Sequence, residues 1–323
     1  MKKIARALLV LYLFIPISVF AYSNYLIASG ENIGIELKAD NVIIVGSYEI
    51  NHHDTLQESE LQIGDKLLKI NDIQITDVKS IDQILNSINN NQVEITYLRN
   101  NHEYKTNLVL QKEDGQYKTG LYVKDTIRGV ATLTYIDMEN GTFGALGHEI
   151  IEKTTKSKFE STNGTIFKST VLGITKSTDG NPGEKNARSY SDRVYGTVSE
   201  NTTSGIFGKY TVDIQQNKRY KVASPDEIKL GKAKILTVID GDKVEEFDIN
   251  ILKVNKNSNS KNILFEVTDK ELLEKTGGIV QGMSGSPIVQ DDKIVGAVNF
   301  VLVEKTDKGY GIFITSMLEE AEN

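Results

Sequence analysis

The chain has 323 residues, a length typical of about two domains. Its net charge is −7, with 25% charged residues, 7% aromatic residues and no Trp. This mildly acidic composition argues against a nucleic-acid-binding protein, which normally carries a basic surplus. The absence of cysteine excludes disulfides, thiol catalysis and cysteine-bound metals.

The N-terminus has the pattern of an export signal. Three basic residues among the first six precede an almost wholly apolar run over residues 7–21, and Val19-Phe20-Ala21 is a suitable cleavage site. The run is shorter than a full span of about 20 residues. We therefore expect residues 1–21 to be a signal peptide, with an uncleaved membrane anchor or a buried helix as alternatives. The rest of the chain is expected to lie across a membrane from the cytoplasm.

Residues 30–115 alternate between short strands and one helix. Over residues 80–88 the apolar residues fall at 81, 84, 85 and 88, which is one helix face, and Ser80 is a suitable N-cap. Strands are expected on both sides of this helix, with turns at Asn71-Asp72 and Asn100-Asn101. The expected strands are residues 42–45, 67–70, 73–75, 93–98 and 105–110.

This order of elements resembles a bacterial PDZ domain. The resemblance rests on Leu61-x-Ile63-Gly64-Asp65-x-Leu67-Leu68-x-Ile70-Asn71, the helix that begins at Ser80 and the closing strands. It implies that the domain binds an extended peptide end by strand addition. The candidate carboxylate-binding loop is Ile33-Gly34-Ile35. The alternative is a small α/β module without a ligand.

Residues 116–323 are rich in short β-branched runs separated by glycine. Turns recur about every ten residues, which is typical of an antiparallel sandwich or barrel, and only residues 269–275 show a good helix pattern. The four histidines are His52, His53, His102 and His148, and none has the spacing of a catalytic zinc site. We expect neither a metal nor another cofactor.

The most suggestive motif is Gly282-Met283-Ser284-Gly285-Ser286-Pro287. Glycine tolerates the dihedrals that hold a nucleophilic hydroxyl clear of the backbone. In such a turn, the amides of Gly282 and Ser284 would form an oxyanion hole. Ser286 is an alternative nucleophile, and an ordinary surface turn is an alternative to any active site.

A serine nucleophile normally needs a base, and His148 is the histidine of the β-rich region. Glycine and small apolar residues flank it, which suits a buried and oriented imidazole. The third group would be an acid that orients the imidazole. Spacing cannot choose among the candidates, which are Asp192, Asp213, Asp226, Asp240, Asp248 and Asp269.

Five longer blocks resemble the stage IV sporulation protein B (SpoIVB) peptidase family. They are residues 120–125, 129–134, 143–148, 277–288 and 309–314, and the resemblance covers nearly the whole chain. It implies a mainly β fold, in which a small α/β PDZ domain (30–115) precedes a trypsin/chymotrypsin-like β-barrel serine peptidase domain (116–323). It also implies His148 as the base, Ser284 as the nucleophile and Asp269 as the orienting acid, with a helix N-cap as the alternative role of Asp269.

Three positions depart from the family pattern: Glu149 stands in place of glycine, Asn299 in place of histidine, and residues 55–60 lack a turn rich in small residues. The resemblance implies a serine endopeptidase of sporulation signalling, exported to the intermembrane space of the forespore. There it would cleave a membrane-associated regulator, and itself, and so trigger activation of a late sigma factor. The alternative is a non-enzymatic PDZ-containing binding protein with a degenerate protease barrel.

Overall fold

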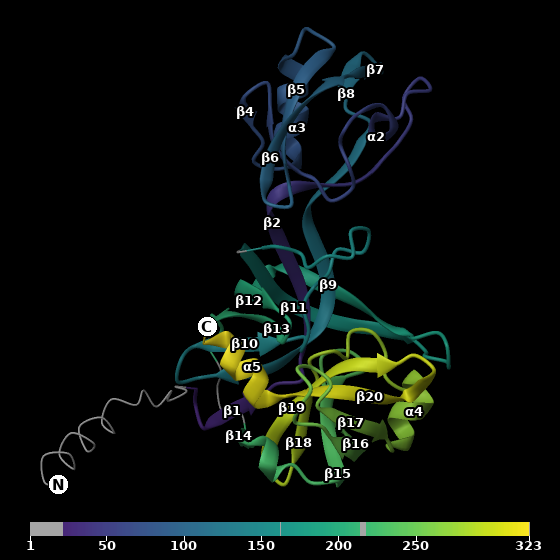
Figure 1. Ribbon diagram of the computed structural model, residues 1–323. Helices are drawn as coiled ribbons and strands as arrows, with labels where there is room; N and C mark the ends of the chain where they lie inside the picture. Colours follow the sequence, from purple (N-terminus) through teal and green to yellow (C-terminus); the bar gives the residue numbers. More distant parts are fainter. Residues whose placement is uncertain (1–21, 162, 214–217, 323) are drawn as a thin grey trace, which may run out of the picture.

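A computed structural model describes residues 22–161, 163–213 and 218–322 (Figure 1). The described residues are mainly β, as predicted. The predicted export segment, residues 1–21, lies outside them. No helix among the described residues combines the length and apolar character needed to cross a membrane.

The elements are as follows in chain order. The strands are β1 (Tyr25–Ala28), β2 (Asn32–Ser47), β3 (Lys66–Ile70), β4 (Ile73–Gln74), β5 (Gln92–Arg99), β6 (His102–Val109), β7 (Gln111–Glu113), β8 (Gln116–Lys118), β9 (Leu121–Asp137), β10 (Thr142–Ala145), β11 (Asn163–Thr175), β12 (Glu184–Thr202), β13 (Gly205–Tyr210), β14 (Arg219–Val222), β15 (Gly231–Val238), β16 (Val244–Val254), β17 (Ile263–Val267), β18 (Pro287–Gln290), β19 (Lys293–Leu302) and β20 (Lys305–Phe313). The helices are α2 (Thr55–Glu58), α3 (Val78–Ser87), α4 (Lys270–Thr276), α5 (Ile314–Ala321) and the short 3₁₀ helix η1 (Pro225–Glu227).

The upper module in Figure 1 contains the strands and helix predicted for the PDZ region. Its turns at Asn71-Asp72 and Asn100-Asn101 have positive φ at both residues, the conformation that favours two-residue hairpins. Helix α3 buries Ile81, Ile84 and Leu85, three of the four residues of the predicted face. Its N-cap is Asp77 rather than Ser80, because Asp77 Oδ1 accepts from the Ser80 amide and completes a capping box.

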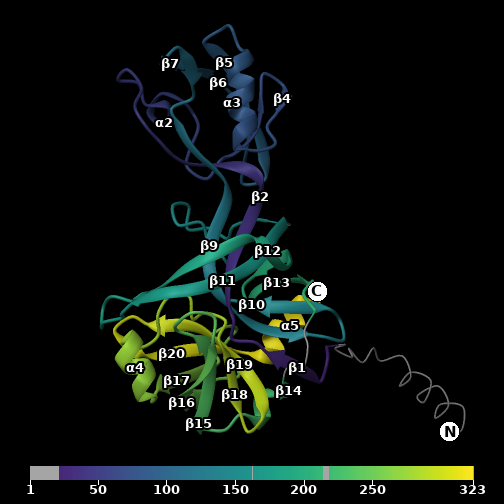
Figure 2. The same ribbon diagram turned by 180° about the vertical axis from the view of Figure 1, so that it is seen from behind.

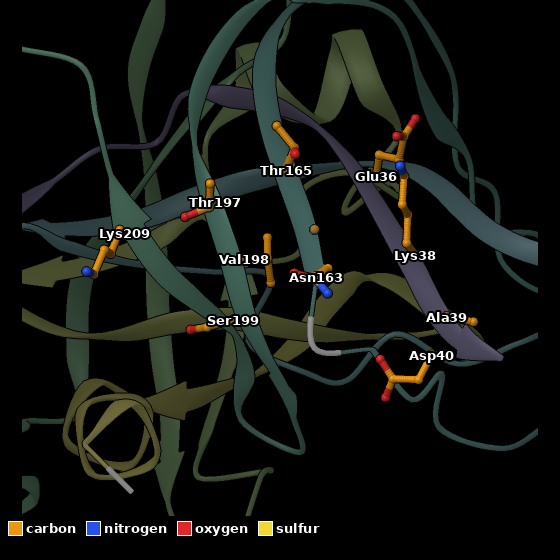
Figure 3. Close-up of a pocket in the computed structure, with 11 residues that line it drawn as sticks. Glu36, Lys38, Ala39, Asp40, Asn163, Thr165, Thr197, Val198, Ser199 and Lys209 are labelled. Carbon is orange, nitrogen blue, oxygen red and sulfur yellow. The ribbon is translucent and has the colours of Figure 1, made fainter. Parts of the chain in front are cut away.

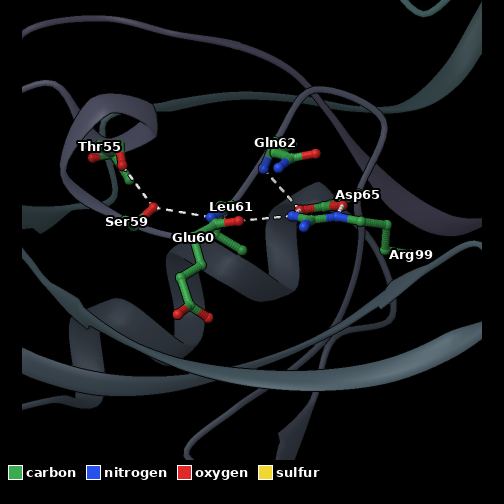
Figure 4. Close-up of polar contacts among 7 residues, drawn as sticks. All are labelled: Thr55, Ser59, Glu60, Leu61, Gln62, Asp65 and Arg99. Atoms are coloured by element: carbon green, nitrogen blue, oxygen red, sulfur yellow. Dashed lines mark hydrogen bonds and ion pairs between the residues drawn. The ribbon is translucent and has the colours of Figure 1, made fainter.

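The Gly64-Asp65 turn of this module is held by a buried carboxylate. Arg99 Nε donates to Asp65 Oδ1 at 2.7 Å, and Arg99 Nη2 donates to Asp65 Oδ2 at 2.6 Å and to the Glu60 carbonyl (Figure 4). The Gln62 amide donates to the same carboxylate. This bidentate pair therefore joins the turn to β5.

The PDZ-like module is inserted into the peptidase region rather than placed before it. Strands β2 and β9 run together from the lower part of the molecule into the module (Figures 1 and 2). In the lower part, residues 32–38 of β2 pair with β9 on one edge, and residues 33–38 pair with β11 on the other. Residues 32–38, predicted as part of the module, therefore belong to the β-rich region, whose first strands come before the module.

This arrangement also corrects the predicted peptide-binding loop. Ile33, Gly34 and Ile35 have paired strands on both sides, and the side chains of Ile33 and Ile35 are buried. Strand addition needs an unpaired edge. These three residues consequently cannot form a carboxylate-binding loop in this structure.

The β-rich region forms two lobes, each with its own core. In the first lobe, antiparallel pairs link β2, β9, β10, β13, β12 and β11, and β11 pairs back to β2. In the second, they link β15, β16, β17, β20, β19 and β18, and β18 pairs back to β15. Phe143 and Ile166 are fully buried in the first core, and Phe265 and Ile288 in the second.

Candidate active site

A cavity of about 580 Å³ brings residues of both lobes together. The first lobe contributes residues 127–130 of β9 and the segment after β10, and the second contributes residues before β18 and the end of β19. His148 and Ser284 both line this cavity. Two residues that are 136 positions apart therefore meet at one site, as the sequence predicted for a base and a nucleophile.

Backbone shape places His148 at the cavity. Leu146 and Gly147 follow β10 with φ of 74° and 75°, so the chain turns sharply just before the histidine. A left-handed conformation at a leucine is unfavourable by about 1 kcal/mol or more. The turn is held because the Leu146 amide donates to the Thr132 carbonyl and the Leu146 side chain is buried.

The hydrogen bonds of His148 suit a general base. Its Nδ1 lies 2.8 Å from the Glu149 carbonyl oxygen. A carbonyl only accepts, so Nδ1 carries the proton and Nε2 presents a lone pair. Burial lowers the pKa of His148, more than its contacts with Glu149 raise it. The ring also stacks on Phe300, with centroids 5.4 Å apart.

Ser284 lies in a turn that requires its glycines. Gly282 and Gly285 have φ of 94° and 93°. A Cβ on Gly285 would lie 2.2 Å from the Thr132 carbonyl oxygen, which no side chain can tolerate. The Gly285 amide donates to the Val298 carbonyl and so fixes the turn to β19.

The turn presents the atoms expected of a nucleophile site. Among the described residues, the amides of Gly282 and Ser284 have no hydrogen-bond acceptor, as an oxyanion hole requires. Ser284 Oγ donates to the Asn299 carbonyl at 3.2 Å rather than to the imidazole. Ser286 is fully buried. Ser284 is therefore the serine of this turn that a substrate could reach.

Asp269 does not reach His148 in this structure. Its carboxylate caps helix α4, where Oδ1 accepts from the Leu272 amide at 2.9 Å and Oδ2 from the Asp248 amide at 3.4 Å. Asp269 does not line the cavity, and Glu149 is the acidic residue that does. The backbone carbonyl of Glu149 thus accepts the hydrogen bond from His148 Nδ1 that the predicted acid would accept.

A second and larger cavity, of about 910 Å³, lies on the outer face of β2, β11 and β12 (Figure 3). Glu36, Lys38, Thr165, Thr197 and Lys209 are among the residues around it. It contains no histidine and none of the predicted site residues. The smaller cavity is therefore the candidate active site.

The sequence did not indicate Thr132 and Lys185. Thr132 Oγ1 donates to the Gly282 carbonyl, and Lys185 packs against Gly282 and donates to Thr132 Oγ1. Thr132 lies in one of the short β-branched runs, and nothing in the sequence shows which face of that run is buried. Lys185 follows Asn181-Pro182-Gly183, a pattern typical of a surface turn. A lysine there is expected to be exposed, so no signal in the sequence indicates its position.

The chain matches the model of the family described as SpoIVB peptidase S55 over residues 115–318, which is more than half of its length. No curated protein matches it. Among solved structures, the Rv3671c protease from M. tuberculosis in its active form is 11% identical. That match covers 61% of this chain and 74% of that chain, with a TM-score of 0.35. The PDZ domain of an SdrC-like protein from Listeria monocytogenes is 16% identical and matches 26% of this chain and 87% of that chain, with a TM-score of 0.23.

Proposed function

Since the chain belongs to the SpoIVB peptidase S55 family and is a serine peptidase, we propose that Ser284 is its nucleophile and His148 its general base. The observation that carries this assignment is their meeting at one cavity, with an Nδ1-protonated imidazole and an accessible serine. In the first step, Nε2 takes the Ser284 proton while Oγ attacks the scissile carbonyl. Ser284 Oγ must first leave the Asn299 carbonyl.

The amides of Gly282 and Ser284 would then donate to the oxyanion of the tetrahedral intermediate. The imidazolium returns its proton to the leaving amine, which leaves an acyl-enzyme on Ser284. Water activated by the same imidazole hydrolyses the acyl-enzyme. The Glu149 carbonyl would stabilise the imidazolium during both steps, because it already accepts from Nδ1. Asp269 as the orienting acid stays a prediction from the family resemblance.

The cavity favours an apolar stretch of protein substrate. The apolar residues Ile127, Ile151, Val301 and Val303 line it. The family implies a role in sporulation signalling. On that basis, the proposed substrates are a membrane-associated regulator and the enzyme itself, cleaved in the intermembrane space of the forespore.

The PDZ-like module offers a different peptide-binding edge from the predicted one. Residues 121–124 of β9 pair with β2 on one edge, and no strand among the described residues pairs with the other. Helix α3 lies beside β9 here, where its Val78 amide donates to Asp125. We therefore assign strand addition of an extended peptide to this edge. Peptide binding should slow amide hydrogen exchange at residues 121–124 and leave residues 33–35 unchanged, whereas slowing at 33–35 alone would contradict the assignment.

A fluorophosphonate probe tests the nucleophile. Wild type should be labelled, and Ser284→Ala should not. Ser286→Ala is the matched control and should still be labelled, because Ser286 is buried. Labelling that persists in Ser284→Ala would refute the assignment. Absence of labelling in folded wild type would favour the non-enzymatic alternative.

A further inference from the structure

A lysine amine lies buried beneath the turn that carries Ser284. Lys185, at the start of β12, is 6% exposed. Its Nζ donates to Thr237 Oγ1 at 2.9 Å and to Thr132 Oγ1 at 3.3 Å, and both threonines are fully buried. None of the ion pairs among the described residues includes Lys185. Burial lowers its pKa to about 7. A buried amine without a carboxylate is unfavourable, which calls for a reason for its presence.

Lys185 also supports the turn through its backbone and its stem. The Lys185 amide donates to the Gln281 carbonyl at 2.9 Å, and the Gln281 amide donates to the Gly183 carbonyl at 2.8 Å. The stem then passes under Gly282, where a Cβ would lie 3.1 Å from Lys185 Cδ. Gln281, just before the turn, and Gly282, its first residue, therefore both contact Lys185.

Thr132 transmits this support to the two residues that bear the oxyanion donors. Thr132 Oγ1 accepts from Lys185 Nζ, so its own proton is available to donate to another acceptor. Thr132 Oγ1 donates to the Gly282 carbonyl at 2.8 Å, and the Thr132 amide donates to the Ser284 carbonyl at 3.0 Å. Both carbonyls are thus held inward, toward β9.

We propose that Lys185 is a positioning residue of the peptidase reaction, acting through Thr132 to keep the Gly282 and Ser284 amides aimed at the cavity. The peptide unit that carries the Ser284 amide lies between the units of the Gly282 and Ser284 carbonyls, both of which Thr132 holds. The unit that carries the Gly282 amide contains the Gln281 carbonyl, which accepts from the Lys185 amide. Both unpaired amides are therefore restrained from turning away from the substrate. This inference rests on the proposed nucleophile, Ser284.

The test compares full-length variants in the rate of fluorophosphonate labelling and in kcat and KM for a fluorogenic peptide. Thr132→Val removes the hydroxyl and keeps the shape, whereas Thr132→Ser keeps the hydroxyl and loses a methyl group. We expect Thr132→Val and Lys185→Met to lower kcat and the labelling rate at least tenfold, with KM within about threefold. This minimum is below the 10²–10³-fold effect of losing one oxyanion donor outright, because the amides themselves remain. Thr132→Ser should stay within about threefold of wild type.

The matched control is Thr96→Val, which makes the same change at a buried threonine of β5 in the PDZ-like module. It should label at the wild-type rate. Thermal unfolding of each variant identifies any that do not fold. If Lys185→Met does not fold, the two Thr132 variants decide the question.

Two outcomes would overturn the inference and leave Ser284 as the nucleophile. One is a wild-type rate in either Thr132→Val or folded Lys185→Met. The other is an equal loss in Thr132→Ser and Thr132→Val, which would show that Thr132 acts through packing alone. Labelling that survives Ser284→Ala would instead overturn the nucleophile assignment and this inference together.

Discussion

The wall of the cavity that carries Ser284 is held by buried side chains, whereas the wall that carries His148 is held by backbone shape. On the first, the Thr132 hydroxyl and amide fix two carbonyls of the turn, and Thr134 Oγ1 fixes the Gly285 carbonyl. On the second, a left-handed leucine and the neighbouring carbonyl orient the imidazole. The proposed oxyanion donors are therefore organised before substrate binds, while the contact between the proposed base, His148, and the proposed nucleophile, Ser284, must still form.

The largest expected effect is a loss of activity on removing the proposed base, His148. His148→Ala should lower kcat/KM about 10⁴-fold or more, because removing one member of such a catalytic unit removes most of its effect. His102→Ala, at the exposed start of β6, is the matched control and should leave peptide hydrolysis unchanged. Wild-type hydrolysis by His148→Ala would mean that another group takes the Ser284 proton.

The next effect tests the turn that bears Ser284. Gly285→Ala forces a Cβ against the Thr132 carbonyl at a positive φ, and should lower stability by about 3 kcal/mol or abolish folding. Gly141→Ala also has a positive φ but has open space around it, so it should lose only about 1 kcal/mol. Chemical denaturation measures both, and equal losses would contradict the tight fit at Gly285.

Stability should depend on pH through Lys185. Its pKa is about 7 when folded and about 10.4 when unfolded. Between these values the unfolded chain binds the additional proton, so stability rises with pH by roughly 1 kcal/mol per pH unit. The full penalty of burying the charge applies below pH 7. Urea denaturation at pH 7 and pH 9 should show this rise in wild type and a smaller rise in Lys185→Met; equal rises would place the titration elsewhere.

The smallest expected effect concerns Asp269. As an N-cap, it should tolerate Asp269→Asn, because asparagine caps helices equally well, whereas Asp269→Ala should lower stability by about 1 kcal/mol. Both variants should retain turnover if the arrangement described above is the working one. A loss of about 10⁴-fold in folded Asp269→Asn would show instead that Asp269 orients His148 in the working enzyme, as the family resemblance implies.

Local patterns predicted much of the fold correctly. The Asn100-Asn101 turn depends on the backbone preference of asparagine, and the apolar face of α3 on a period of 3.6 residues. Both signals lie within a few neighbouring residues, so the sequence shows them directly. The prediction failed for Ile33-Gly34-Ile35, whose strand pattern is the same whether its partners belong to the module or to the lobe. Asp269 illustrates the same limit, since an aspartate before a helix suits both an N-cap and a catalytic acid.

The amino-acid sequence by itself determined the mainly β character, the glycine-bounded turn around Ser284 and His148 as the candidate base, because these follow from residue type and short spacing. Only the tertiary structure decided that β2 begins in the first lobe, that Asp269 caps a helix and that Lys185 lies under Gly282. The positions of β2 and Lys185 depend on which distant strand a segment pairs with, and the role of Asp269 depends on whether the fold brings it to His148. Pairing partners are chosen by burial over the whole chain, since many strands share the same alternating pattern.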